Sequence, residues 1–407
     1  MRIAYITQWW PPEGATIVAS LARELSRRGH QLDVVTGFPN YPSGKIYDGY
    51  RLRWRQIEHS DGLRTVRVPL YPSHDRSALK RGANYASFGV AASTIGVAHL
   101  GRPDVAYVYH PPITSAWPVR VLRRLRGVPF VLHIQDLWPE SVVHSGMVGE
   151  GRRNRRIEAA IERMARAAYR AAAHIVVISP GFKERLVARG VPSRKITVIM
   201  NWADETIFKP TKAAPEVRAQ LGPQESRLVI YGGNLGDFQG LETPVRVAAR
   251  FRGRGIHLVL VGDGLARHRL ESLVSELGVQ NVSILPPRSP TEIQPFLAAA
   301  DAHLVSLRDL SFFDSTIPGK TQVAMAMGKP MIASLRGDGA HLVERSQSGF
   351  TCAPGEEALC RAFERFLSCS PEDLDNMGNN GYDFYKSNLS LKAAGASFEN
   401  IFDRSGQ

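Results

Sequence analysis

Strand-like and helix-like segments alternate along this chain in two successive series. In the first, strands are predicted at residues 2–7, 31–36, 104–109, 130–134 and 174–178, with helices at 15–28 and 113–125. A polar, proline-containing stretch begins near residue 201. Beyond it, strands are predicted at 227–231, 257–261, 282–285, 302–306 and 330–334, with helices at 242–251, 266–277, 291–299 and 321–327. This alternation predicts parallel, doubly wound sheets, and 407 residues are too many for one core, so we expect two similar α/β domains.

The composition excludes several classes of protein. Hydrophobic residues make up 43% of the chain and the glycine and proline contents are ordinary, which excludes disordered and fibrous chains. Its three cysteines (Cys352, Cys360 and Cys369) have neither metal-ligand spacing nor an even number, so we expect reduced thiols in a cytoplasmic protein. The first residues read as a strand and a loop rather than a signal peptide, and no run of about 18 apolar residues predicts a membrane span. The nearest apolar stretch, residues 86–100, is expected to form a buried or interfacial helix.

Positive charge is in excess and is unevenly distributed. The formal net charge is +13, and residues 119–126 and 151–170 are rich in arginine with helical spacing. Such an excess permits nucleic acid, anionic lipid or a phosphorylated substrate as a partner. Aromatic residues are not interleaved with these arginines and no recognition-helix motif occurs, so nucleic acid is the least favoured of the three.

The first predicted strand leads into a loop, TQWWPPEGAT, that is suited to an anion. Gly14 and Ala15 stand where this loop enters a helix, and the N-terminus of a helix favours negative charge. An ordinary strand–helix turn explains a single glycine equally well. The three glycines of a dinucleotide fingerprint are absent, which disfavours NAD.

Two loops of the second half are also suited to phosphate. Residues 231–240 (YGGNLGDFQG) follow a strand, and such a loop exposes N–H groups at little steric cost. We take Gly233, Asn234 and Gln239 from this loop as candidate ligand-binding residues. Gly262 lies in VGDG after the next strand, at the same carboxyl edge where open α/β sheets bind ligands.

A lysine at a predicted helix start is a further phosphate candidate. Gly319 and Lys320 lie in IPGKTQ, which resembles the end of a P-loop, but Asp314 stands where that motif requires glycine, so an NTPase loop is excluded. Lys320 can still hold a pyrophosphate, and Arg308, after the preceding strand, is a second candidate. For both side chains a solvated surface charge is the alternative interpretation.

Polar side chains also follow two strands of the first half. His133, Asp136 and Glu140 lie in PFVLHIQDLWPES, and His110 ends a neighbouring strand in YHPP. An imidazole and carboxylates at a carboxyl edge suit hydrogen bonding to substrate hydroxyls or acid–base chemistry. The alternative is that Asp136 caps a turn and His133 is a hydrogen-bonded structural residue.

Several of these segments together resemble a known family. TQWWPPEGAT, ELSRRGHQLDVVTGFPNYP, HIQDLWPES, ISPGFKERL, VGDG and PGKTQ are similar to segments of the retaining GT-B glycosyltransferases of the large group-1 family. Within that family, the branch that builds bacterial exopolysaccharide and O-antigen repeats is the most similar. The similarity runs over nearly the whole chain, and DLWPES and GFPNYP are its most specific parts.

The resemblance implies a fold, a reaction and a set of residue roles. It implies two Rossmann-like domains facing a central cleft: residues 1–200 binding the acceptor, residues 201–385 binding the nucleotide sugar, and a C-terminal helix, 386–407, returning to the first domain. It implies a UDP-sugar donor, no metal ion and no other cofactor. By resemblance His133 contacts the donor sugar, Gly14 lies near the diphosphate and Lys320 approaches the phosphates.

The chain departs from the family pattern at the expected nucleotide site. Ser315 and Val323 stand where many members carry two glutamates, one of which binds the ribose, so ribose recognition is assigned to another residue such as Gln322. Asn234 and Gln239 replace an arginine and a lysine that approach the phosphates.

These features favour sugar transfer as the reaction, but other acceptors and other functions are not excluded by the sequence. With a lipid-linked acceptor, residues 86–100 and the flanking Lys80 and Arg81 would lie at the inner face of the membrane; with a soluble acceptor, the basic face is merely solvated. A nucleotide-sugar epimerase of the same fold is the second hypothesis. A nucleic-acid- or lipid-binding protein without catalysis is the third.

Overall fold

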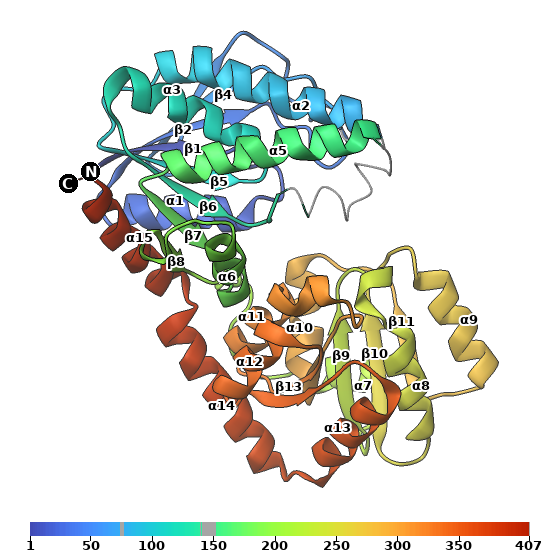
Figure 1. Cartoon of the computed structure of the whole chain (residues 1–407). Coiled ribbons are helices and arrows are strands. Elements are labelled where there is room, and N and C mark those ends of the chain that lie inside the picture. Colours follow the sequence, from blue (N-terminus) through green and yellow to red (C-terminus); the bar gives the residue numbers. More distant parts are fainter. Residues whose placement is uncertain (74–76, 139, 141–151, 407) are drawn as a thin grey trace. The chain divides into compact units, whose positions relative to one another are not determined.

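The computed structural model describes residues 1–73, 77–138, 140 and 152–406. The chain divides into two compact units, Met1–Met200 with Ala394–Gln407 as unit 1, and Asn201–Ala393 as unit 2. Each contains a mainly parallel sheet covered by helices (Figure 1). The predicted pair of α/β domains with parallel sheets is therefore confirmed.

Unit 1 is built on an eight-stranded sheet in the order β3–β4–β2–β1–β5–β6–β7–β8. The strands are β1 (Arg2–Ile6), β2 (Gln31–Gly37), β3 (Gln56–Ser60), β4 (Leu63–Val68), β5 (Val105–His110), β6 (Phe130–Ile134), β7 (His174–Val177) and β8 (Ile196–Val198). The helices are α1 (Thr16–Arg27), α2 (Ala78–Ala91), α3 (Ala116–Arg126), α5 (Arg152–Ala171), α6 (Pro180–Ala188) and α15 (Leu391–Gly406), with shorter turns η1 (Ala92–Gly96), η2 (Ile113–Ser115) and η3 (Ser193–Lys195).

One strand pair of unit 1 departs from the parallel pattern. β3 and β4 pair antiparallel at the edge of the sheet, joined by Asp61 and Gly62. Both turn residues have positive φ, 53° and 73°, and Asp-Gly is a sequence that tolerates this conformation in a two-residue hairpin. Both strands are absent from the sequence prediction, although the Asp-Gly pair is a recognisable signal for them.

The two faces of the unit 1 sheet meet different helices. Alternate strand residues point to opposite faces, so Ala106 and Val108 pack in the hydrophobic cluster that includes residues of α2, α3 and α5. On the other face, the hydroxyl of Tyr5 donates to the carbonyl oxygen of Val18 in α1 (2.7 Å), and the ring of Tyr107 contacts Phe398 of α15.

The apolar stretch at residues 86–100 is a core element of unit 1. It forms the end of α2 and the π-helical turn η1, and Phe88, Ala92 and Ile95 are buried. Val90 is the large apolar side chain of this stretch that remains exposed. The apolar face is therefore occupied by the protein interior, and of the two expectations for this stretch, a buried or an interfacial helix, the buried one is confirmed.

Unit 2 contains a six-stranded parallel sheet in the order β11–β10–β9–β12–β13–β14. Its strands are β9 (Arg227–Gly232), β10 (Ile256–Val261), β11 (Val282–Leu285), β12 (Ala302–Ser306), β13 (Met331–Ser334) and β14 (Gly349–Cys352). The helices are α7 (Pro215–Leu221), α8 (Glu242–Arg250), α9 (Arg267–Leu277), α10 (Pro290–Ala299), α11 (Gly319–Ala326), α12 (Gly337–Arg345), α13 (Glu356–Ser368) and α14 (Pro371–Asn388), with turns η4 (Asp237–Gln239) and η5 (Ser311–Ser315). Two hydrophobic clusters, one on each face of the sheet, form its core.

Candidate functional site

Close backbone packing brings the glycine loops of unit 2 together. Gly233 N donates to Val261 O (2.9 Å) and Leu235 N donates to Asp263 O (2.8 Å), so the loops after β9 and β10 run side by side. A Cβ at Gly262 would collide with the carbonyl oxygen of Gly233, which explains the glycine in VGDG. Gly233 itself is exposed and has φ of +132°, a conformation that side chains rarely adopt.

Lys320 lies against this glycine loop. Its ammonium nitrogen is 4.6 Å from the centre of the Tyr231 ring, a cation–π contact. A Cβ at Gly233 would lie 3.1 Å from the same nitrogen, so the lysine occupies space that a larger residue at 233 would close. Burial lowers the pKa of Lys320 to about 8. Among the described residues no carboxylate pairs with it, and the ammonium therefore lacks a counter-charge.

The other predicted residues of unit 2 surround the same loop. Arg308 N donates to Phe238 O (2.9 Å), and the exposed Arg308 side chain has no ion pair in the described part of the chain. Ser306 Oγ donates to Gln239 O (2.8 Å), whereas Gln239 Oε1 is buried without a hydrogen-bond partner there. Asn234 is exposed, and its amide lies between Gly236 and Gly264.

Gln322 points back toward its own helix. It is 2% exposed, and its amide nitrogen donates to the carbonyl oxygens of Pro318 (2.7 Å) and Gly319 (3.3 Å) at the start of α11. Val323 packs against the hydrophobic cluster beside α10. These contacts do not test the suggestion that Gln322 holds a ribose, which stays a prediction.

In unit 1, His133 is enclosed. The hydroxyl of Tyr107 lies 2.7 Å from its Nδ1, the amide nitrogen of Gln135 lies 2.9 Å from its Nε2, and the ring of Phe398 packs against it at 5.1 Å. Burial lowers the pKa of His133 to about 3, so the ring is neutral at physiological pH. Both ring nitrogens of His133 have partners within the protein, so we expect it to act by orienting a neighbour such as Gln135.

His110, at the end of β5, is buried without a polar partner. Neither ring nitrogen forms a hydrogen bond with any described residue, and the ring packs edge-on against Trp138 at 5.7 Å. Burial lowers the pKa of His110 to about 3, so this ring is also neutral. Two unsatisfied buried nitrogens cost free energy, and a ligand hydroxyl is one group that would satisfy them.

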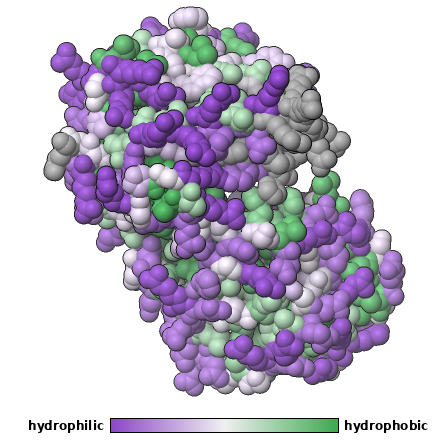
Figure 2. Space-filling view, viewed as in Figure 1, coloured by the Kyte–Doolittle hydropathy of each residue, from purple (hydrophilic) through white to green (hydrophobic). Residues whose placement is uncertain are grey.

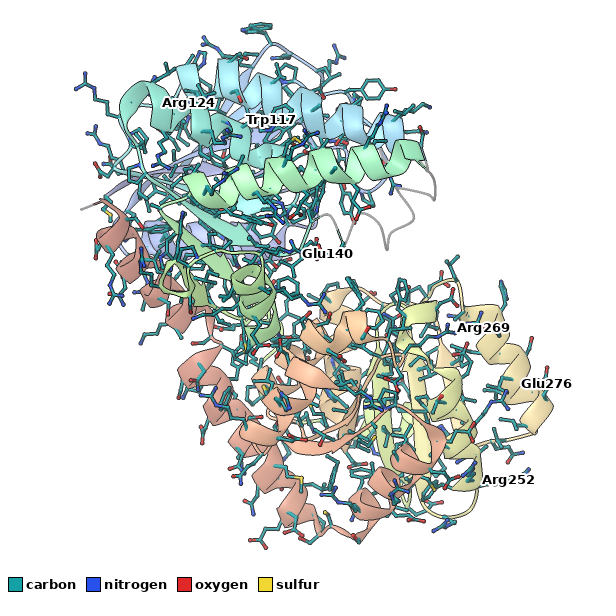
Figure 3. The ribbon with its side chains drawn as sticks, in the orientation of Figure 1. Trp117, Arg124, Glu140, Arg252, Arg269 and Glu276 are labelled. Atoms are coloured by element: carbon teal, nitrogen blue, oxygen red, sulfur yellow. The ribbon has the colours of Figure 1, made fainter. Side chains whose placement is uncertain are left out.

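The two carboxylates that follow β6 differ in their surroundings. Asp136 is exposed, although the protein around it removes enough hydration to raise the pKa of its carboxyl. Glu140, which is labelled in Figure 3, forms an ion pair with Arg189, the residue that follows α6. Pro139 and Ser141 of the DLWPES motif lie outside the described residues.

The first loop of unit 1 is held by a carboxylate that the sequence prediction missed. Glu13 is 4% exposed and accepts hydrogen bonds from the backbone nitrogens of Trp10 (3.1 Å), Asn40 (2.7 Å) and Tyr41 (2.8 Å). Burial raises the pKa of Glu13, although these backbone bonds oppose the rise. These hydrogen bonds join the loop after β1 to the GFPNYP segment after β2. In the sequence, the glutamate between the prolines and Gly14 is the only indication of this contact.

Gly14 and Ala15 follow this glutamate at the start of α1. A Cβ at Gly14 would meet nothing within 4 Å, so protein packing does not require the glycine. The backbone nitrogen of Ala15 already donates to Glu13 O (2.7 Å). No side chain of a described residue caps the N-terminus of α1, which leaves the amides of its first turn for water or an anion.

A second network links three neighbouring amide side chains at the same edge. Gln8 Nε2 donates to Asn84 Oδ1 (2.6 Å), and Asn84 Nδ2 donates to Asn40 Oδ1 (3.2 Å). All three side chains are buried. Because Asn84 belongs to α2, sequence spacing could not associate it with the ends of β1 and β2.

The excess positive charge belongs to unit 1. Unit 1 contains 31 Lys and Arg residues against 16 Asp and Glu, whereas unit 2 contains 20 against 22. Figure 2 shows hydrophilic residues over much of the visible face of unit 1, with hydrophobic residues in small patches. Within the described residues, no helix combines the length and apolar character needed to cross a membrane, and no cluster of His, Cys, Asp and Glu could hold a metal ion.

Two α/β units, each built on a mainly parallel sheet, are the architecture that GT-B glycosyltransferases share. Two family models match the chain: a glycosyl transferase 4-like domain at residues 14–202 and a glycosyl transferases group 1 domain at residues 226–369. The chain belongs to the group 1 glycosyltransferases, and the predicted family and fold class are confirmed.

Individual relatives agree with this assignment. A protein of Escherichia coli (strain K12), named as the colanic acid biosynthesis glycosyl transferase WcaI, is 29% identical over 313 residues, which is 75% of each chain. Among solved structures, sucrose-phosphate synthase from Thermosynechococcus elongatus matches with a TM-score of 0.70 at 21% identity, covering 99% of this chain and 98% of the other. Anabaena Alr3699/HepE in complex with UDP-glucose matches with a TM-score of 0.69 at 17% identity, covering 99% and 100%.

Proposed function

We propose that the protein transfers a sugar from a UDP-sugar bound by unit 2 to an acceptor hydroxyl bound by unit 1, with retention of anomeric configuration and without a metal ion. Lys320 carries the proposal. It is a half-buried ammonium group without a carboxylate partner in the described chain, beside the exposed residues Gly233 and Asn234 of the loop after β9. A diphosphate is the counter-charge that such a site would accept.

The reaction follows from charge development in the donor. As the bond between the sugar carbon and the diphosphate oxygen breaks, the electron pair passes to the diphosphate and the sugar gains oxocarbenium character. Lys320, with Arg308 and the amides near Gly233, would stabilise the departing negative charge, and preorganised groups of this kind are usually the largest catalytic contribution.

In unit 1, we propose that Asp136 and His110 contact hydroxyl groups and that Asp136 accepts the proton of the attacking hydroxyl. Glu140, which is ion-paired with Arg189, is a further candidate for binding the acceptor. His133 is a positioning residue that orients Gln135.

The acceptor that we propose is a polyprenyl-diphosphate-linked glycan at an anionic membrane surface. The WcaI relative is named for colanic acid biosynthesis, a polysaccharide pathway, and unit 1 carries the excess of arginine and lysine that an anionic acceptor would attract. The proposal includes a reaction on the cytoplasmic side of the membrane.

A nucleotide panel followed by a transfer assay tests the proposal. UDP should raise the melting temperature more than GDP, dTDP or ADP, and UDP-sugars should then donate to lipid extracted from polysaccharide-producing cells, with or without a chelator. Proton NMR of the product reports the anomeric configuration. Failure of every nucleotide to bind, an inverted product, or isomerised sugar formed from donor alone would each reject the proposal.

A further inference from the structure

Two partly exposed aromatic side chains of unit 1 have no part in the proposed reaction. Trp9 lies in the loop after β1, and Tyr41, which is 38% exposed, lies in the GFPNYP segment after β2. Their ring centres are 5.4 Å apart and the ring planes are inclined by 46°. The two rings therefore form one aromatic surface, which we call the Trp9–Tyr41 surface.

A buried carboxylate holds the two loops that carry these rings. Glu13 accepts hydrogen bonds from the backbone nitrogen of Trp10, next to Trp9, and from the backbone nitrogen of Tyr41 (2.8 Å). The hydroxyl of Thr7 also donates to the carbonyl oxygen of Trp9 (2.9 Å). The backbone beside both rings is therefore fixed by the protein itself.

A buried arginine joins the same two loops from the neighbouring strand. Arg67 of β4 is 1% exposed, and its guanidinium donates to the carbonyl oxygens of Pro11 (2.6 Å) and Gly37 (3.2 Å). It also pairs with Glu58 (2.8 Å), because a buried guanidinium costs free energy unless its donors are satisfied. Two buried charges, Arg67 and Glu13, thus fix loops whose aromatic rings stay partly exposed, which is typical of a preorganised binding surface.

The sheet order brings this surface to the edge that carries the proposed acceptor-binding groups. β2, β1, β5 and β6 are consecutive and parallel, so the residues that follow them lie along one edge of the sheet. Neighbouring strands are about 4.8 Å apart, which puts the ends of β1 and β6 about 10 Å from each other. Trp9 follows β1, and Asp136, the proposed base, follows β6. These strand ends are close enough for one ligand to contact residues of both.

Tyr85 of α2 links the aromatic surface to Asp136. Burial raises the pKa of Tyr85, the charge of Arg81 lowers it, and Tyr41 and Asp136 raise it further. Tyr41 and Asp136 therefore both lie within electrostatic reach of the Tyr85 hydroxyl. The Tyr85 ring also contacts Trp138, two residues after Asp136, with ring centres 6.1 Å apart. The aromatic surface and the proposed base thus share one neighbourhood.

The combination of aromatic rings with an exposed carboxylate favours one class of ligand. A pyranose has an apolar C–H face that packs on an aromatic ring, and hydroxyl groups at its rim that donate to a carboxylate. A phosphate group would be repelled by Asp136, and an isoprenoid chain would give this carboxylate no hydrogen-bond donor. A neutral sugar ring therefore fits this surface better than the diphosphate or the lipid of the proposed acceptor.

We propose that the Trp9–Tyr41 surface binds the sugar of the acceptor by packing against its C–H face, and that it selects a sugar-bearing acceptor over a bare lipid phosphate. The inference rests on the proposed sugar transfer and adds two specificity-determining residues to its acceptor side. Trp9 and Tyr41 hold the ring, and its hydroxyl groups reach toward Asp136.

Binding of free sugars tests the surface without any need for transfer. The probes are the methyl glycosides of glucose, galactose, mannose, fucose and N-acetylglucosamine, titrated into the full-length protein and followed by saturation-transfer NMR with irradiation of the aromatic protons. At least one glycoside should bind, and Trp9→Leu and Tyr41→Leu should each weaken its binding by about three- to tenfold. Trp9→Phe and Tyr41→Phe keep an aromatic ring and should retain most of the binding.

Removal of a ring elsewhere provides the control. Tyr382 of α14 in unit 2 is also a partly exposed aromatic residue, and Tyr382→Leu should bind the glycoside within about twofold of the parent protein. Melting temperatures are measured for every variant, and the exposure of Tyr41 predicts that Tyr41→Leu folds. No binding of any glycoside by the parent, undiminished binding by both leucine variants, or an equal loss in Tyr382→Leu would overturn the proposal.

The transfer assay then assigns the bound sugar to the acceptor. Trp9→Leu should raise the KM for the lipid-linked glycan by about three- to tenfold, whereas kcat and the KM for the UDP-sugar should stay within about twofold. Bare polyprenyl phosphate should give no product. If the bare lipid is also glycosylated, or if the donor KM rises equally, the inference is wrong although sugar transfer stands. Sugar binding that depends on Trp9 without any transfer would reject the proposed function and keep the sugar-binding surface.

Discussion

At the scale of single residues, Lys320 connects the fold to the proposed chemistry. Its ammonium rests on Tyr231 beside Gly233 and has no carboxylate partner in the described chain. Lys320→Met keeps the volume and removes the charge, so kcat/KM for sugar transfer should fall by about 10²- to 10³-fold, as when one preorganised donor is lost. The exposed Lys212 is a matched control, and Lys212→Met should keep the parent rate. An equal loss in both variants would contradict the assignment.

The pKa of Lys320 adds a dependence of donor binding on pH. Because burial lowers this pKa to about 8, the ammonium loses its charge as the pH rises through 8 rather than near the usual value for lysine. UDP should therefore bind about tenfold more weakly at pH 9 than at pH 7. Titration of Lys320→Met over the same range supplies the reference, since its dissociation constant should not follow this titration. A flat profile for the parent protein would exclude Lys320 from the diphosphate site.

The sequence reveals some of these residues more readily than others. Lys320 could be selected because glycine precedes it at a predicted helix start, and Gly233 because its loop follows a strand. The Tyr231 ring beneath the lysine could not be predicted, since the contact requires β9 and α11 to meet in three dimensions. The enclosure of His133 was hidden for the same reason: Phe398 packs against it from a helix more than half the chain away.

At the scale of elements, α15 is fixed to unit 1 by packing and by charge. Glu399 accepts from Arg28 (3.0 Å) and lies 2.9 Å from His30 Nε2, and Phe398 packs against Tyr107 and His133. The C-terminal return to the first half rested on resemblance alone, because nothing local in residues 394–407 specifies a partner. Strands of β-branched residues were easier to predict, since their signal lies within each segment.

The charged contact of α15 makes a measurable contribution to stability. Burial alone would raise the pKa of Glu399, but its bonds with His30 and Arg28 outweigh burial and lower it. The contribution is therefore present at neutral pH and is lost as the pH falls through the lowered pKa. Glu399→Gln should cost about 1 kcal/mol, or roughly 2 °C in the melting temperature of unit 1 at pH 7. The difference should shrink as the pH is lowered and Glu399 becomes protonated, and Asp403→Asn on the exposed side of the same helix should show no effect over the same range.

At the scale of the whole molecule, charge is divided between the units. Unit 1 has nearly twice as many cationic as anionic side chains, whereas unit 2 is close to neutral. Because α2 and η1 bury their apolar face, attraction to a membrane must come from this charge and from isolated exposed side chains. Residues 51–55 (RLRWR) are such a segment: Trp54 is 73% exposed, Leu52 is 47% exposed, and three arginines accompany them without ion pairs in the described chain.

This segment gives the proposed membrane contact a specific test. Exposed arginines are attracted to anionic headgroups with a strength that salt screens, and a neighbouring tryptophan suits the interface. The full-length protein should float with phosphatidylglycerol vesicles at low salt and dissociate at about 0.5 M salt. Arg53→Gln with Arg55→Gln should weaken flotation by at least about threefold, since each basic residue near the surface contributes about 1 kcal/mol. Arg246→Gln with Arg361→Gln in unit 2 removes the same charge and should leave flotation unchanged; equal losses would mean that net charge, rather than this segment, attracts the protein to the vesicle.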